Sequence, residues 1–386
     1  MRRKLIRITT VPISLKYLIK GQMRFMKENG FDVKMMSADG EEREGIVKNE
    51  DCEHVILPLT RMITPIQDLR AVIKLYKFLR KEKPQIVHTH TPKAGVVGMF
   101  AAYLARVPNR LHTVAGLPLL EAKGFKRTVL NFVEKLTYRY ATRIYPNSYG
   151  LKELILKNKF TEVNKLKVIA NGSSNGIDTA YFDPKLFTFD DWKGLKDDLG
   201  VKETDFVFIF VGRIVGDKGI NELIQAFDQT STENKNVKLL LVGHFEDDLD
   251  PLLEKTKEII NINKQIISVG FQNDVRPYFA IADVLVFPSY REGFPNVVMQ
   301  AGAMELPSIV SNINGCNEII EEGENGWIIP VKDENAIFKV MLNCFNNTEQ
   351  FNYAKENARR LILERYEQKK VWDAILTEYK SIENNV

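Results

Sequence analysis

Two positively charged residues stand in a glycine-rich loop in the second half of the chain. The stretch 212–219 reads GRIVGDKG and follows an apolar run at 206–211. Glycines let the backbone turn sharply, and the helix predicted after the loop would offer free N–H groups to an anion. Arg213 and Lys218 would add the charge-assisted hydrogen bonds that a diphosphate requires. The loop is neither a Walker loop nor a dinucleotide-binding loop, and a basic loop after a strand is more often only solvated.

Carboxylate and amide side chains follow two later apolar runs. The stretch 288–301 reads PSYREGFPNVVMQA, with Glu292 in the loop and Gln300 on the helix predicted beyond it. The stretch 312–318 reads NINGCNE and includes Glu318. In open parallel sheets, ligands bind at the carboxyl ends of the strands. We therefore expect these two loops and the basic loop to form one ligand-binding edge.

Short apolar, β-branched runs alternate with amphipathic segments along the chain. This alternation predicts parallel sheets covered by helices on both faces. The strands expected are 4–10, 32–37, 85–89, 111–115, 143–146 and 167–170 in a first series, and 206–211, 238–242, 266–269, 284–287 and 308–310 in a second. The helices expected are 15–29, 68–83, 94–105 and 127–143, then 219–229, 251–260, 297–303 and 335–345.

Two such series in 386 residues predict an α/β protein with two doubly wound, Rossmann-like domains that face each other across a cleft. The domains are expected at 1–183 and 184–366. A C-terminal helix at 367–386 is expected to join the first domain.

Composition indicates a globular protein without a disulfide framework. The three cysteines are scattered, which suits a reducing cytoplasm. No apolar stretch is long enough to span a membrane, the N-terminal run is too short and too charged for a signal peptide, and no nucleic-acid-binding module is evident. Residues 1–178 contain 32 Lys and Arg against 16 Asp and Glu, and the remainder contains 22 against 34. The asymmetry favours two domains with different partners over a chance drift of surface charge.

The C-terminal half resembles the retaining nucleotide-sugar glycosyltransferases of family 4, which have the GT-B fold. The matching stretches are VGRIVGDKG at 211–219, Gly270-Phe271, PSYREGFPNVVMQAGAME at 288–305 and NGCNEII at 314–320. The N-terminal half extends the resemblance through TTVPISLKYLIKGQMRFMKENG at 9–30, HTHTPKAG at 88–95, HTVAGLP at 112–118 and NGID at 175–178. Within the family, the chain is similar to bacterial enzymes that build capsule, O-antigen lipopolysaccharide or lipid-linked oligosaccharides.

The resemblance implies a role for each residue that matches a family motif. Arg213 and Lys218 match the basic pair that holds the donor diphosphate and neutralises the leaving group in place of a metal. Glu292 matches a glutamate that contacts the donor sugar. These three are the implied catalytic residues, and the other implied donor-binding residues are Gly212, Gly270, Phe271, Gly293, Phe294, Pro295, Asn296, Gln300 and Glu318. The nucleotide sugar would be a co-substrate, with UDP favoured and GDP open, and neither a metal nor a cofactor would be required.

Two positions depart from the family pattern. Gln300 stands where the family usually has a glutamate that binds the ribose hydroxyls; glutamine can still form hydrogen bonds but carries no charge. Ala115 stands where many relatives have a histidine that contacts the donor sugar. The first departure bears on donor affinity, and the second requires either that the imidazole is absent or that another residue supplies it.

The residues expected on the acceptor side or in the cleft are Thr10, His88, His90, His112, Asn175 and Asp178. The three histidines are predicted at strand ends facing the cleft. His88 and His90 precede a turn and would hold acceptor phosphate, whereas His112 is equally well interpreted as a buried strand histidine. Zinc binding is not expected, because no third ligand accompanies the pair.

The basic N-terminal half also bears on the acceptor. The segments 68–83 and 123–143 carry apolar residues at helical spacing with Lys and Arg around them. Such helices can lie on an anionic membrane surface, although any helix that covers a sheet needs an apolar face as well. We expect a cytoplasmic protein, peripheral on the inner face of the plasma membrane, that acts on a glycan or a polyprenyl-diphosphate-linked acceptor.

Two other interpretations use the same architecture. A UDP-sugar 2-epimerase would also bind a nucleotide sugar between two domains, but it would need carboxylates placed for proton abstraction. A non-catalytic GT-B binding subunit would account for Ala115 and Gln300, although it would have no need to keep Arg213, Lys218 and Glu292 together. Fold by itself cannot choose among these functions.

Overall fold

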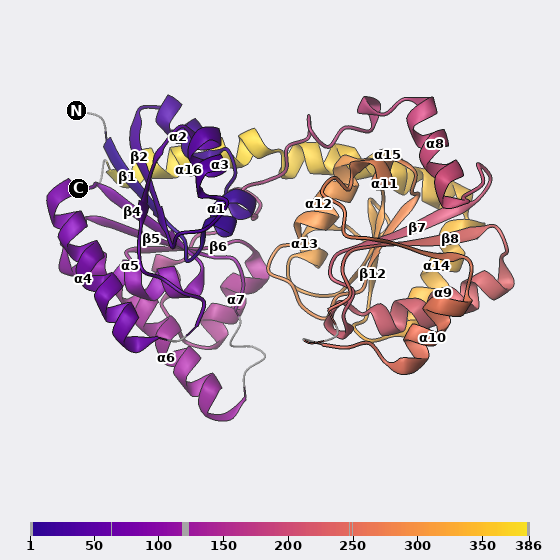
Figure 1. Cartoon of the computed structure of the whole chain (residues 1–386), viewed down its shortest axis with the longest axis horizontal. Coiled ribbons are helices and arrows are strands. Elements are labelled where there is room, and N and C mark those ends of the chain that lie inside the picture. Colours follow the sequence, from indigo (N-terminus) through magenta and orange to yellow (C-terminus); the bar gives the residue numbers. More distant parts are fainter. Residues whose placement is uncertain (1–2, 63, 118–122, 247, 249, 384–386) are drawn as a thin grey trace. The chain divides into compact units, whose positions relative to one another are not determined.

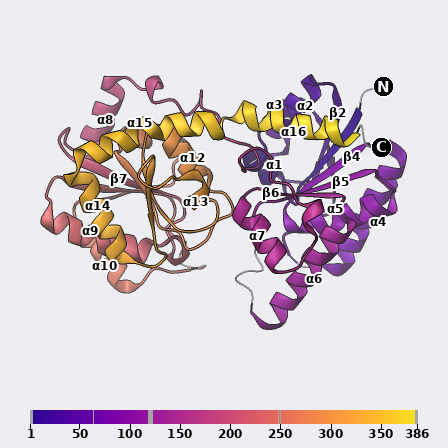
Figure 2. The same ribbon diagram turned by 180° about the vertical axis from the view of Figure 1, so that it is seen from behind.

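The computed structural model describes residues 3–62, 64–117, 123–246, 248 and 250–383. The chain forms two compact units: a first unit of Met1–Gly176 with Gln368–Val386, and a second unit of Ile177–Glu367. Figure 1 shows both units in the colours of the sequence, and Figure 2 shows them from behind. No helix in the described part of the chain is long and apolar enough to cross a membrane. Pro118, which ends the 112–118 motif, and residues 384–386 of the expected C-terminal helix lie outside the described residues.

The first unit contains a six-stranded parallel sheet in the order β3-β2-β1-β4-β5-β6. Its strands are β1 (Arg3–Ile8), β2 (Phe31–Ser37), β3 (Glu53–Ile56), β4 (Ile86–His90), β5 (Asn109–Val114) and β6 (Arg143–Pro146). Its helices are α1 (Pro12–Leu18), α2 (Gln22–Glu28), α3 (Arg43–Glu50), α4 (Pro65–Glu82), α5 (Pro92–Leu104), α6 (Gly124–Tyr140), α7 (Tyr149–Lys157) and α16 (Gln368–Glu383). This strand order is that of a doubly wound nucleotide-binding fold.

Side chains along each strand of the first sheet alternate between two covered faces. On one face, Ile6 and Val87 pack in a cluster with buried residues of α4, α5 and α6. On the other face, Leu5 and Leu111 pack with residues of α2 and α16. In Figures 1 and 2, α16 lies along one side of this sheet and α4, α5 and α6 lie along the other. The last helix of the chain therefore completes the core of the first unit.

The second unit repeats the topology with the order β12-β11-β10-β7-β8-β9. Its strands are β7 (Phe206–Val211), β8 (Val237–Val242), β9 (Ile266–Gly270), β10 (Val284–Phe287), β11 (Ser308–Ser311) and β12 (Gly326–Ile329). Its helices are α8 (Phe189–Leu199), α9 (Ile220–Glu233), α10 (Glu254–Ile262), α11 (Arg276–Ala280), α12 (Asn296–Ala303), α13 (Cys316–Ile319), α14 (Glu334–Asn346) and α15 (Thr348–Arg365). Two parallel Rossmann-like sheets confirm the predicted α/β fold class.

Several expected elements differ in the structure. The helix expected at 15–29 is two helices, because Gly21 adopts a left-handed conformation (φ 80°) where a Cβ would lie 2.6 Å from the Trp372 ring. The strand expected at 167–170 is wrong: this segment is irregular, and only the preceding Leu166 bridges to Ile144 of β6. The strands β3 and β12 were not predicted. Both lie at an edge of their sheet, where short strands carry the weakest apolar signal.

The two units divide between Gly176 and Ile177, whereas the sequence placed the boundary at 183/184. Residues 177–183 pack with the second unit because Ile177 and Phe182 are buried in its core. Arg359 of α15 donates hydrogen bonds to the carbonyl oxygens of Thr179 and Phe182 at 2.9 and 2.7 Å. A composition shift alone gives no sign of these contacts.

Gly243 offers a test of the close backbone approach at the end of β8. A Cβ on Gly243 would lie 1.7 Å from the carbonyl oxygen of Gly212, whereas a Cβ on the exposed Gly194 of α8 would meet nothing within 4 Å. We expect Gly243→Ala to lower the free energy of unfolding of the second unit by about 2 kcal/mol or more. Gly194→Ala should raise it by about 0.5–1 kcal/mol.

Urea unfolding followed by thiol labelling can measure both effects, because buried Cys316 and Cys344 report on the second unit and buried Cys52 on the first. Equal unfolding midpoints for the two glycine variants would contradict the steric argument.

Candidate functional site

An ion pair between Lys218 and Glu292 forms the centre of the polar edge of the second sheet. Lys218 ends a short 3-10 turn, Gly216–Lys218, directly before α9, and its ammonium group is paired with a Glu292 carboxylate oxygen. Both side chains are mostly buried, at 16% and 18% exposure. Ser289 donates a hydrogen bond to the same oxygen at 3.1 Å. A partly desolvated cation is thus held at the N-terminus of α9, where an anion would also be favoured.

Two glycines allow the loops at this edge to approach closely. At Gly219 (φ 73°) a Cβ would lie 2.2 Å from the carbonyl oxygen of Pro288, and at Gly315 (φ 78°) it would lie 2.6 Å from that of Gly293. Asn314 donates a hydrogen bond to the Gly293 carbonyl oxygen at 2.6 Å. The basic loop, the Glu292 loop and the 312–318 loop therefore meet at the carboxyl ends of β7, β10 and β11, as expected.

Arg213 lies at the same edge but has a different partner. Its guanidinium group pairs with Glu246 at 3.0 Å, and its side chain is 45% exposed. The Asp217 carboxylate pairs with Arg291 at 2.5 Å, and the Asp217 backbone N–H donates a hydrogen bond to the Asp250 carboxylate. Both cations of the basic loop are therefore paired with carboxylates. Arg213 remains the more accessible of its two cations.

The other residues predicted to bind the donor differ in exposure. Phe294 and Pro295 are buried, and the Phe294 ring packs against Tyr366 with centroids 5.4 Å apart. Asn296 is exposed at the start of α12, and Gln300 is partly exposed on the same helix. Glu318 is partly exposed on α13, and its carbonyl oxygen accepts a hydrogen bond from the Tyr366 hydroxyl at 2.8 Å.

Gly212 and Gly270 end strands at the same edge. Gly212 directly follows β7, and Gly270 is the last residue of β9 with φ 68°. Phe271, beside Gly270, is 55% exposed, and its ring stacks on His244 with centroids 4.9 Å apart and planes at 4°. The two rings form a flat apolar surface after β8 and β9.

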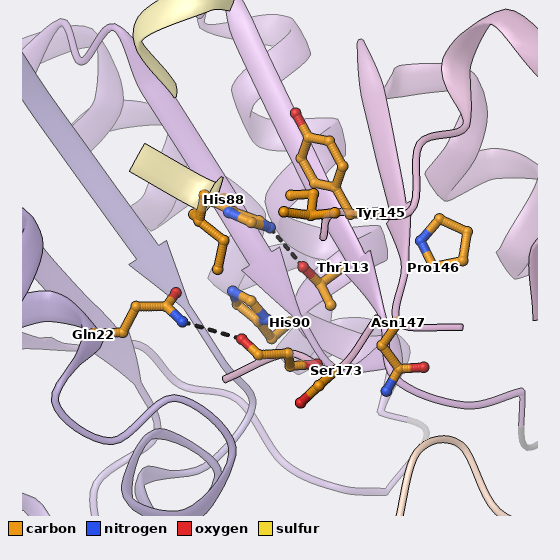
Figure 3. A pocket seen from close by; sticks show the side chains of 11 residues that line it. Gln22, His88, His90, Thr113, Tyr145, Pro146, Asn147 and Ser173 are labelled. Carbon is orange, nitrogen blue, oxygen red and sulfur yellow. Dashed lines mark hydrogen bonds between the residues drawn. The ribbon is translucent and has the colours of Figure 1, made fainter. Parts of the chain in front are cut away.

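The first unit contains a polar pocket on the face of its sheet that α16 covers (Figure 3). His88, His90 and Thr113 point into it from β4 and β5, and Gln22 lies beside them. The His88 and His90 rings stack with centroids 4.4 Å apart. Both histidines were predicted at strand ends, yet His88 lies in the middle of β4, and both are almost fully buried.

His112 does not join this pocket. It lies on β5 next to Thr113, so strand alternation directs it to the opposite face of the sheet. There its Nδ1 bonds to the Thr89 hydroxyl at 2.8 Å, and a Cβ on Gly95 of α5 would lie 2.6 Å from its ring. The structure thus supports the interpretation of His112 as a buried strand histidine.

The remaining acceptor-side candidates make local contacts. Thr10 bonds through its hydroxyl to Thr91 at 2.8 Å, and Thr91 has φ 76°, which is strained for a β-branched residue. Asn175 accepts a hydrogen bond from the Trp372 indole N–H at 2.7 Å. Asp178 caps the backbone N–H groups of residues 180 and 181 and belongs to the second unit.

Burial keeps the histidines of the first unit neutral. Desolvation lowers the pKa of His112 to about 4 and holds the pKa values of His88 and His90 well below their usual range. Arg7, buried beside the pocket, lowers the pKa of His88 and His90 further through its positive charge. Among the described residues, no three His, Cys, Asp or Glu side chains gather as a metal site would require.

Comparison with known proteins identifies the family. The family model described as Glycosyl transferases group 1 matches residues 193–361, and that described as Glycosyl transferase 4-like domain matches residues 19–172. Over 381 residues the chain is 34% identical to the capsular polysaccharide biosynthesis glycosyltransferase CapM of Staphylococcus aureus, covering 98% of this chain and 97% of CapM. The chain belongs to the family 4 glycosyltransferases of the GT-B fold.

One further relative and one solved structure of similar fold extend the comparison. One is the UDP-Gal:alpha-D-GlcNAc-diphosphoundecaprenol alpha-1,3-galactosyltransferase of Escherichia coli, 31% identical over 79% of this chain and 77% of that protein. The other is HepE of Anabaena, solved in complex with UDP. Its structure matches with a TM-score of 0.82 at 18% identity and covers 98% of this chain and 100% of HepE.

Sequence reasoning missed several side chains that the glycosyltransferase places at its two polar sites. Glu246 lies a few residues beyond β8, so the rule that pointed to Arg213 could also have found it. Asn314 stands in the 312–318 loop that the sequence did single out, but its hydrogen bond to Gly293 was not predicted. Arg7 is a charged residue within an apolar strand. That position could have indicated that Arg7 is buried and has a polar partner elsewhere in the chain. Tyr379 gave no comparable signal, because it looks like any apolar residue on the inner face of a helix.

The buried histidines predict an acid sensitivity that is confined to the first unit. Because the pKa of His112 is lower in the folded protein than the ordinary 6.5, the unfolded chain binds more protons below pH 6.5. The stability that neutral His112 contributes is therefore fully present above about pH 6.5 and is lost as the pH falls toward 4. For His112 we expect a loss of about 2 kcal/mol at pH 5.

Urea unfolding with a thiol reagent that reacts at low pH should show the Cys52 midpoint falling between pH 7 and 5 more than those of Cys316 and Cys344. His112→Gln should reduce this dependence, and the matched His244→Gln, at an exposed position in the second unit, should not. A parallel fall of all three cysteine midpoints would contradict the assignment.

Proposed function

We propose that this glycosyltransferase transfers a hexose or N-acetylhexosamine from a UDP-sugar, with retention of configuration and without a metal, onto a lipid-linked surface glycan. The observation that carries the proposal is the Lys218–Glu292 pair at the N-terminus of α9. A donor diphosphate would replace Glu292 as the partner of Lys218. The carboxylate thus released would accept hydrogen bonds from the hydroxyl groups of the donor sugar.

The proposed leaving-group chemistry uses the two cations of the basic loop. As the bond between the sugar C1 and the diphosphate oxygen breaks, negative charge grows on that oxygen, and Lys218 and Arg213 would stabilise it. The acceptor oxygen would bond to C1 on the same face, and its proton would pass to the departing diphosphate. No amino-acid nucleophile is required, so the protein contributes orientation and electrostatic stabilisation.

The choice of UDP is supported by relatives. HepE of Anabaena was solved with UDP and with UDP-glucose, and the Escherichia coli relative is named for a UDP-Gal donor. The Phe271–His244 surface would offer a flat platform to the base. The capsular and diphosphoundecaprenol relatives support a surface glycan on a lipid carrier as the acceptor.

A lipid-linked acceptor would place the enzyme on the inner face of the plasma membrane. On α4, the exposed apolar residues Ile66, Leu69 and Ile73 lie at helical spacing among exposed Arg and Lys side chains. On α6, Phe125 is 85% exposed and Phe132 is 63% exposed. Large apolar side chains beside basic ones are typical of a surface that rests on anionic lipid.

Substitution of Lys218 tests the donor site. We expect Lys218→Ala to lower the transfer rate by about 100-fold or more, because one charge-assisted contact to the leaving group is lost. Lys257→Ala, at a partly exposed position on α10, is the matched control and should leave the rate unchanged. The assay measures release of UDP from a panel of UDP-sugars in the presence of EDTA, with thermal unfolding to check the fold.

A near-normal rate for Lys218→Ala would overturn the diphosphate assignment, and a rate restored only by added Mg²⁺ would overturn metal independence. Free sugar-nucleotide isomers without transfer would favour an epimerase. Binding of UDP without turnover of any donor and acceptor would favour a non-catalytic subunit.

Vesicle binding tests the membrane proposal. We expect Phe125→Ser to weaken co-sedimentation with vesicles of phosphatidylglycerol and phosphatidylcholine by about tenfold, since burial of one aromatic side chain contributes about 1.5–3 kcal/mol. Ile262→Ser, at a 77% exposed position in the second unit, is the control. Equal loss for both variants, or equal binding to neutral vesicles, would contradict a basic-apolar membrane surface on the first unit.

A further inference from the structure

The pocket of the first unit contains polar atoms that have no partner within the protein. His90 Nε2, Asn147 Oδ1 and Ser174 Oγ are buried and form no hydrogen bond, and all three residues line the pocket. They come from three separate segments: the end of β4, the end of β6, and the loop that precedes Asn175. Because an unpaired buried polar group costs about 1–3 kcal/mol, three of them around one pocket indicate a site for a polar group.

A chain of hydrogen bonds leads from a buried cation to this pocket. Arg7 donates from Nη1 to the Tyr379 hydroxyl oxygen at 2.5 Å, and that hydroxyl lies 2.5 Å from His88 Nδ1. His88 Nε2 lies 2.8 Å from the Thr113 hydroxyl, and Figure 3 shows these two side chains joined at the pocket wall. Arg7 also donates to the side-chain oxygen of Gln22, which lines the pocket.

The donor at each step follows from chemistry. Arginine can only donate, so the Tyr379 oxygen accepts from Arg7. Among the described residues, His88 Nδ1 is the acceptor within reach of the single Tyr379 hydroxyl hydrogen, and donation to it avoids an unpaired buried hydrogen. His88, neutral because it is buried, must then carry its hydrogen on Nε2 and donate it to Thr113. With its oxygen occupied as an acceptor, the Thr113 hydroxyl has one hydrogen left to donate.

We propose that Tyr379, on the C-terminal helix, is a positioning residue that fixes His88 in its Nε2-protonated form and thereby directs the Thr113 hydroxyl, as a donor, to an uncharged oxygen of the acceptor sugar. This inference rests on the proposed transfer to a glycan.

The lining of the pocket favours an uncharged hydroxyl or acetamido group over a phosphate. None of the described residues that line it is a Lys, Arg, Asp or Glu. Thr113 and Ser174 can donate and Asn147 can accept, a mixture that matches a sugar hydroxyl, whereas a phosphate needs donors alone. Pro146, Ile169 and Ile375 supply the apolar part of the lining.

Nitrogen-15 NMR of histidine-labelled protein tests the chain directly, and five histidines make the assignment practicable. We expect wild-type His88 to show a protonated Nε2 and an unprotonated Nδ1 at neutral pH. Tyr379→Phe should shift both nitrogen signals toward a mixture of tautomers, because Nδ1 loses its donor. Tyr138→Phe is the matched control, since it removes an equally buried hydroxyl on the opposite face of the sheet. An Nδ1-protonated His88 in the wild type, or an unchanged tautomer in a folded Tyr379→Phe variant, would overturn the role of Tyr379.

Titration with a neutral sugar and with an anion tests the pocket. Methyl N-acetyl-α-glucosaminide should shift the His88 and His90 signals, and inorganic phosphate should not. Thr113→Val should weaken the sugar response by about tenfold, and Thr113→Ser, which keeps the hydroxyl, should retain it. A response to phosphate alone would overturn the uncharged class of ligand, and no response to either would overturn the pocket as a sugar site. Neither measurement depends on turnover, so a failure of the proposed transfer reaction would appear separately, as absence of UDP release with a normal NMR response.

Discussion

The parallel pairing of the β-strands determines where the loops of this protein can lie. Each strand of a parallel sheet must be followed by a crossover that returns the chain to the same starting edge, so the six carboxyl ends of a sheet all meet at the other edge. In the second unit this geometry alone gathers the basic loop after β7, the Glu292 loop after β10 and the Asn314 loop after β11. Gly219 and Gly315 then permit the close backbone approach that brings those loops into contact. A single substitution at one of these glycines would separate residues that are far apart in the chain but adjacent at the site.

The two units differ in how their buried charged and polar side chains are paired. In the second unit the cations Lys218 and Arg213 are each paired with a carboxylate, Glu292 and Glu246 respectively, so a bound anion would have to compete with a carboxylate for either cation. In the first unit the buried Arg7 has hydrogen-bond acceptors without a carboxylate partner, namely Tyr379 and Gln22, and the neighbouring histidines are neutral. A site that exchanges ion pairs suits a diphosphate, and a site of fixed neutral donors and acceptors suits hydroxyl groups. The two sites differ because burial removes water from charged groups in the second unit, which then need a counter-charge, and mainly from neutral groups in the first unit, which need only hydrogen bonds.

The departures from the family pattern fall at positions that the structure leaves partly open. Gln300 is partly exposed on α12 and Ala115 is partly exposed after β5, whereas the residues around the Lys218–Glu292 pair are held by several contacts. The chain therefore keeps the charged part of the proposed donor site and varies the positions around it. Variation at the edge of a preserved site is the pattern expected where the sugar or the acceptor changes and the leaving group does not.

The sequence by itself determined the two-sheet α/β fold, most of the strands, the family and the loops at the carboxyl edge of the second sheet, because these depend on local apolar periodicity and on short motifs. It did not determine the edge strands β3 and β12 or the break at Gly21, which depend on packing against distant elements such as Trp372. It grouped His112 with His88 and His90, and only the alternation of side chains along β5 and the packing of α5 separated them. The sequence also contained Arg7 and Tyr379 without relating them, although they are hydrogen-bonded across 372 positions. Only the tertiary structure decided that pairing, because a contact between the first strand and the last helix leaves no trace in local periodicity.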